Sequence, residues 1–149
     1  MQLFDVQSVL LARHAQHVVI VHFPIALFAT SYVFDLLSLR SRSRLLRAAA
    51  YANHVAAAFA GPVAIVTGIL AWQWQLAGAR LRGALLLHLI FASVTTILIW
   101  ILWWIRARAG SEDMRANPFY FGVGGVAVAM IALTAHLGGI VSGVIMPGG

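Results

Sequence analysis

Charged residues are scarce in this sequence of 149 residues. They make up 9% of it, whereas about a quarter of the residues of a typical soluble domain are charged. Hydrophobic residues reach 62% and are gathered into long blocks. This composition excludes a soluble catalytic domain and predicts an integral membrane protein. At about 20 residues per membrane span, the chain has room for about four spans joined by short loops.

Cysteine is absent. Its absence excludes disulfides, iron–sulfur clusters, thiolate zinc sites and covalent attachment of haem through a CxxCH motif. Histidine, with six residues, is therefore the main soft ligand besides four methionines. The sequence also offers no Ser–His–Asp set and no paired carboxylates for acid–base chemistry. We therefore expect no standalone enzyme.

Lysine is absent as well, so all ten basic residues are arginines. They lie mostly in short loops between apolar blocks, where they indicate membrane topology rather than nucleic-acid binding. The loops after the first and third blocks hold seven arginines, and the opposite side holds three. Because positive loops stay in the cytoplasm, both termini are expected on the periplasmic side of a bacterial inner membrane, with the lipid bilayer as the first partner.

The apolar blocks predict an all-α fold, an integral membrane four-helix up-and-down bundle in a single domain, residues 1–149. The expected spans cover about residues 17–39, 48–71, 84–105 and 119–145. The mixed residues 1–13 fit either a short interfacial amphipathic helix or a frayed terminus. Asp35, near the inner end of the first span, is expected to form an interfacial ion pair with Arg40 or Arg42.

Histidines within the spans are the candidate functional residues, because ionisable side chains are costly in hydrocarbon and usually mark function there. A rise of 1.5 Å per residue places His22, His88 and His136 at a similar depth near the outer face. The first and third helices of such a bundle are diagonal, a geometry that can hold haem between two imidazoles. His22 and His88 are therefore the favoured axial pair, with His136 as the competing ligand.

Other interpretations of these histidines stay open. The three imidazoles of His22, His88 and His136 also suit a copper or zinc site. Each could instead form hydrogen bonds between helices, or bind a quinone. His17 is about 140° from His22 on a helix, so both cannot face one ligand, and His17 is expected in a supporting or outer-surface position. His54 stands alone in the inner half of its span and is expected to be structural.

Several of these residues lie in motifs that resemble a known family. The segment His17-x-x-x-x-His22-Phe-Pro24-Ile-Ala-Leu27 resembles the HPxxVHFPIAL opening of the bacterial predicted membrane protein family called domain of unknown function 2231. Further similarity lies in Thr67-Gly68, in His88 and in Thr134-Ala-His136-Leu-Gly138-Gly139. Val18 departs from the usual proline, and Ile140-Val-Ser-Gly143 from the usual continuation. The resemblance covers about residues 14–143, implies four spans and singles out His17, His22, His88 and His136, but it implies no cofactor.

The leading functional prediction is a small membrane subunit that binds b-type haem near its outer face. Such a subunit would transfer electrons within a larger redox complex, with other membrane or periplasmic redox subunits as partners and a quinone as a further candidate. The alternatives are a cofactor-free structural subunit and a copper- or zinc-handling membrane protein. The glycines of Gly122-Val-Gly124-Gly125 are expected to give close helix contact or room for a flat macrocycle, and no nucleic-acid partner is expected.

Overall fold

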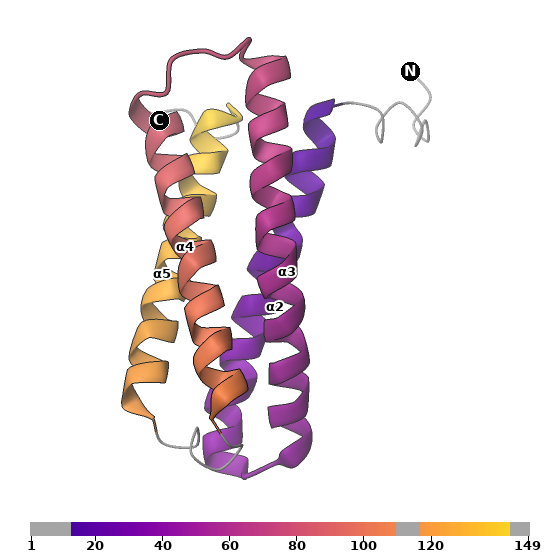
Figure 1. Ribbon diagram of the computed structural model, residues 1–149, viewed down its shortest axis with the longest axis vertical. Helices are drawn as coiled ribbons and strands as arrows, with labels where there is room; N and C mark the ends of the chain where they lie inside the picture. The colour runs from indigo at the N-terminus through magenta and orange to yellow at the C-terminus, as the bar shows by residue number, and fades with distance from the viewer. Residues whose placement is uncertain (1–12, 110–116, 144–149) are drawn as a thin grey trace.

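The structure is a computed structural model that describes residues 13–109 and 117–143 of the chain. These residues form four helices: α2, Arg13–Ser41; α3, Arg44–Gln75; α4, Gly83–Arg108; and α5, Pro118–Val141. All four are long and apolar enough to cross a membrane. The described residues contain no strand. The predicted all-α four-helix membrane bundle is therefore confirmed (Figure 1).

Local sequence explains where the helices begin and end. The Ser43 side chain caps α3 by accepting a hydrogen bond from the Leu46 N–H, and Arg42 before it has a φ of 54° in the tight turn. Asn117 caps α5 in the same way, which satisfies backbone donors that have no partner within the helix. Helix α5 ends at Val141, so the predicted end at residue 145 is too late. Residues 1–12 of the predicted interfacial helix lie outside the described residues.

The bundle is made of two antiparallel hairpins, α2–α3 and α4–α5 (Figure 1). Within each hairpin the helices pack closely along their length, whereas the hairpins meet through fewer contacts, α3 against α4 and α2 against α5. Helices α2 and α4 are therefore diagonal. We call the end with His17 and His88 the histidine end, and the end with Asp35 and Arg106 the arginine end.

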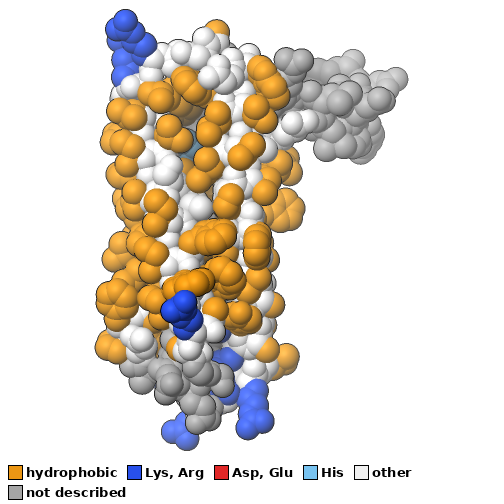
Figure 2. All heavy atoms as spheres, viewed as in Figure 1, with side chains coloured by type: hydrophobic (Ala, Val, Ile, Leu, Met, Phe, Trp, Pro, Cys, Tyr) orange, Lys and Arg blue, Asp and Glu red, His pale blue; other side chains and the backbone are white. Residues whose placement is uncertain are grey.

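The buried core lies between the two ends and is small. Phe28 and Leu102 are its largest fully buried apolar side chains, and alanines fill much of the rest. Most other apolar side chains face outward and cover the surface along the bundle, with arginines at the ends (Figure 2). An apolar surface with charged ends is the surface expected of a protein whose solvent is lipid.

Glycines of α5 let this helix approach α2. The Tyr32 ring of α2 lies against Gly124 and Gly125, and its hydroxyl donates a hydrogen bond to the Phe121 carbonyl over 2.9 Å. A Cβ atom at Gly124 would lie 2.6 Å from Cε2 of Tyr32. Of the two roles expected for these glycines, close helix contact is therefore the one that Gly124 and Gly125 have.

This contact predicts a large difference between two neighbouring glycines. Gly124→Ala is expected to lower the free energy of unfolding by about 1–3 kcal/mol, because overpacking forces the Tyr32 ring or the backbone to move. Gly122→Ala is the matched control, since a Cβ there meets nothing within 4 Å. Thermal unfolding in detergent measures both, and equal stability of the two variants would contradict the contact.

Candidate functional site at the histidine end

His17 is held by a threonine–glycine pair of the neighbouring helix α3. Its Nδ1 lies 3.1 Å from Oγ1 of Thr67, whose single hydrogen is donated to the Ala64 carbonyl over 3.0 Å. The threonine oxygen therefore accepts, and Nδ1 of His17 carries the donated hydrogen. A Cβ at Gly68 would lie 2.9 Å from Cε1 of the imidazole, so the glycine makes space for the ring.

His88 is held in the corresponding way within the other hairpin. Its Nδ1 lies 2.9 Å from the backbone carbonyl oxygen of Thr134 in α5. Because a carbonyl can only accept, Nδ1 of His88 also carries a hydrogen. A Cβ at Gly138 would lie 3.1 Å from Cε1 of this ring. Two of the sequence motifs thus have a physical role, since each places one imidazole against its hairpin partner.

The two imidazoles lie close enough to interact electrostatically. Their hydrogen bonds stay within their own hairpins, so His17 belongs to α2–α3 and His88 to α4–α5. In a neutral imidazole with hydrogen on Nδ1, the lone pair is on Nε2. The histidine end therefore holds two half-buried imidazoles, on diagonal helices, that each have the lone pair on Nε2.

His22 and His136 lie differently from what the sequence predicted. Both side chains are exposed on outward faces of their helices. Nδ1 of His22 donates to the Val18 carbonyl of its own helix over 2.5 Å. The expectation that His22 points into the bundle is therefore wrong. His17, expected in a supporting or an outer-surface position, is half-buried and interacts electrostatically with His88. The described residues contain no group of three metal-capable side chains.

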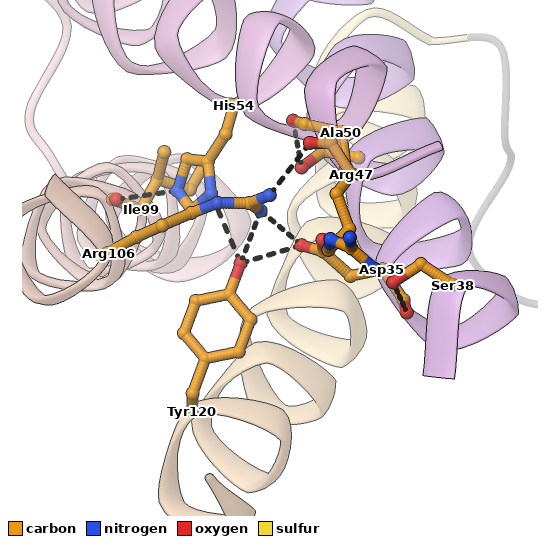
Figure 3. A network of polar contacts seen from close by, with 9 residues as sticks. Asp35, Ser38, Arg47, Ala50, His54, Ile99, Arg106 and Tyr120 are labelled. Carbon is orange, nitrogen blue, oxygen red and sulfur yellow. Dashed lines mark hydrogen bonds and ion pairs between the residues drawn. The ribbon is translucent and has the colours of Figure 1, made fainter. Parts of the chain in front are cut away.

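A second polar cluster, which we call the arginine clamp, joins all four helices at the other end (Figure 3). It consists of Asp35, His54, Arg106 and Tyr120. Arg106 forms an ion pair with Asp35 and donates to the Tyr120 hydroxyl and the Arg47 carbonyl, each over 3.1 Å. The predicted pairing of Asp35 with Arg40 or Arg42 is wrong, because those arginines are exposed near the α2–α3 turn while Asp35 points inward.

His54 is fully buried in this clamp. Its Nε2–H donates to the Ile99 carbonyl over 3.1 Å, and its ring packs edge-on against Phe28. The hydrogen bond to Ile99 crosses from the α2–α3 hairpin to the α4–α5 hairpin, unlike those of His17 and His88. Sequence reasoning missed Arg106 and Tyr120 as partners of Asp35. The available signal was the acid itself, since a carboxylate within an apolar span requires a partner on another helix.

The fold and the two polar clusters define the protein as a multi-pass membrane protein with polar sites inside a four-helix bundle. A family model described as "Predicted membrane protein (DUF2231)" matches residues 13–144. The chain belongs to this family, as its motifs predicted. No curated protein and no solved structure matches the chain.

Proposed function

We propose that the chain holds b-type haem at the histidine end and serves as an electron-transfer subunit of a larger membrane redox complex. The observation that carries this proposal is the pair of imidazoles, His17 and His88, each with Nδ1–H bonded to a protein oxygen. Ligating histidines almost always donate their other ring N–H to a protein or water oxygen. The porphyrin supplies four nitrogens, so haem iron needs only two protein ligands.

The surroundings of the pair suit a flat ligand. Gly68 and Gly138 keep side-chain volume away from the rings. Thr95 lies seven residues beyond His88, about 10 Å along the helix axis, on the same inward face of α4. Its hydroxyl is buried and has no hydrogen-bond partner in the described part of the chain. Buried polar groups are normally satisfied, so this hydroxyl favours a group between the hairpins.

Each anchoring contact has a definite task in this proposal. The Thr67 hydroxyl and the Thr134 carbonyl fix the tautomer and orientation of the two rings, which leaves each Nε2 lone pair available to iron. The apolar side chains of the four helices keep water away from the pair. Haem, when bound, supplies one-electron chemistry at a potential that these contacts and the burial of the site would tune.

The arginine end is the cytoplasmic end in this proposal, because short positively charged loops remain inside. The arginines at this end are Arg40, Arg42, Arg44, Arg47, Arg106 and Arg108. Among the described residues of the α3–α4 connection, at the opposite end, the arginines are Arg80 and Arg82. The histidine end then faces the periplasm of a bacterial inner membrane. Periplasmic or membrane redox subunits are its proposed partners, with a quinone as a further candidate.

Expression with added haem tests the proposal. The purified full-length chain is expected to show a Soret band and a reduced-minus-oxidised spectrum of the b type, with iron bound in proportion to protein. The same preparation without added haem serves as the control for loading. Folded, membrane-inserted protein without a Soret band after haem supplementation would contradict the proposal.

A cofactor-free structural subunit is the second candidate. His54 favours it, because this histidine uses the same type of imidazole–carbonyl bond to join two helices. This function predicts that replacing His17 and His88 with glutamine leaves assembly and partner activity unchanged. Elemental analysis of the same protein separates a third candidate, copper or zinc handling, from iron.

A further inference from the structure

The arginine clamp contains a buried acid whose partners allow two hydrogen-bond arrangements. Asp35 is 5% exposed, and its Oδ2 accepts from the Arg106 guanidinium and, over 2.9 Å, from the Tyr120 hydroxyl. The Tyr120 oxygen also lies 3.4 Å from Nδ1 of His54. One hydroxyl hydrogen thus faces two possible acceptors, the carboxylate and the imidazole (Figure 3).

The imidazole can act as the second acceptor because of its contact with α4. Nε2 of His54 lies against the Ile99 carbonyl, which only accepts, so Nε2 carries the hydrogen and Nδ1 has the lone pair. Rotation about the C–O bond of Tyr120 is enough to turn its hydrogen from Asp35 to His54. The hydroxyl hydrogen has an acceptor in both arrangements, as buried polar groups normally do.

We propose that Asp35 is a proton-binding site, with the Tyr120 hydroxyl as its rotor and His54 as the acceptor that completes the protonated arrangement. One proton from the aqueous phase at the arginine end adds to Oδ2 of Asp35. The new O–H then donates to the Tyr120 oxygen, and Tyr120 donates to Nδ1 of His54. No covalent bond other than the new O–H changes, and the net charge of the site rises by one.

Each of the other three helices contributes a residue to the site, and His54 is linked to the carboxyl through the Tyr120 hydroxyl. Helix α4 contributes the positive charge of Arg106, α5 contributes Tyr120, and α3 contributes His54. The Arg47 guanidinium of α3 donates to the Arg42 carbonyl in the turn. On Asp35's own helix, the Ser38 hydroxyl donates to the backbone carbonyl of Asp35 rather than to its carboxylate.

Arg106 still has favourable contacts when the Asp35 carboxylate loses its charge. After the proton is added, Arg106 keeps two acceptors, the Arg47 carbonyl and the Tyr120 oxygen, each at 3.1 Å. Its guanidinium also lies over the Tyr51 ring, 5.5 Å from the centroid, a favourable position for a cation. The arginine clamp and the histidine end lie at opposite ends of the bundle, so proton binding at Asp35 does not depend on the proposed haem.

Infrared spectroscopy of the full chain in lipid nanodiscs tests this site. The double variant Asp5→Asn/Asp113→Asn leaves Asp35 as the only aspartate of the sequence, so ¹³C-aspartate labels it alone. On acidification we expect the carbonyl stretch of a protonated carboxylic acid, shifted by the label and by exchange into D₂O. Absence of a labelled band at every pH at which the protein stays folded would overturn the proposal.

Two further variants test the roles of the neighbours. His54→Phe keeps the ring but removes the acceptor, so the labelled band is expected to be weaker at each pH at which the parent shows it. Tyr120→Phe removes the rotor and is expected to do the same. His136→Phe is the matched control, because this histidine is exposed at the other end, and it should leave the band unchanged. An unchanged band in His54→Phe would show that Asp35 and His54 are not linked.

Discussion

Arg106→Gln is expected to lower the free energy of unfolding by about 3–5 kcal/mol, the usual cost of removing one partner of a buried ion pair. The change leaves the Asp35 carboxylate in the bundle without its cation and takes donors away from Tyr120 and the Arg47 carbonyl. Because the contacts of Arg106 with Asp35 and with the Arg47 carbonyl join the two hairpins, their loss affects the whole bundle. Chemical or thermal unfolding in detergent, together with the yield of monodisperse protein, measures the effect.

Two controls separate the clamp from a general loss of positive charge. Arg108→Gln removes an exposed arginine that stacks over Trp104 at 4.1 Å, a contact worth about 0.5–1 kcal/mol. Asp35→Asn/Arg106→Gln removes both charges and is expected to be more stable than Arg106→Gln alone, because no uncompensated charge is left. If Arg106→Gln were as stable as Arg108→Gln, the clamp would not hold the hairpins together.

His17→Ala and His88→Ala are each expected to abolish the haem spectrum, whereas His22→Ala and His136→Ala are expected to keep it. The first two imidazoles are half-buried, interact electrostatically and have their Nδ1 hydrogens anchored. The other two are exposed on outward faces. Optical spectra and iron content per folded protein measure the difference in one series of four variants.

Unfolding measurements on the same four proteins distinguish a lost ligand from a lost fold. His17→Gly with added imidazole gives a further check, because a free imidazole restores a missing ligand but cannot restore a general packing defect. Loss of the spectrum in His22→Ala, with retention in His17→Ala, would contradict the assignment of His17. It would favour the axial pair of His22 and His88 that the sequence suggested first.

Composition and block length were enough to predict the four spans, because the hydrocarbon thickness sets the length of an apolar helix. The helices nevertheless extend beyond the apolar blocks; α2 begins at Arg13 rather than at residue 17. The membrane depths estimated from the apolar blocks were therefore in error for the residues of α2. This error led to the pairing of His22, rather than His17, with His88. Five residues correspond to about 7.5 Å along a helix.

The side of each helix that faces the bundle interior was harder to predict than the helices themselves. In a soluble helix an apolar stripe identifies the buried face, but these spans are apolar all round, so neither the inward side of His17 nor the outward side of His22 and His136 could be read. The Asp35–Arg106 pair was missed for another reason. Its members are 71 residues apart, and nearer arginines offered an apparently simpler partner.

That separation has a consequence for how the protein is made. Ribosomes add about 5–20 residues per second, so the Asp35 segment is synthesised on the order of 4–14 seconds before the Arg106 segment that neutralises it. During this interval the first hairpin carries an uncompensated acid that resists settling in lipid. The arrival of α4 removes that obstacle. We therefore expect stable insertion of the α2–α3 hairpin to depend on completion of α4, and a nascent chain truncated before Arg106 to keep the unpaired acid of Asp35.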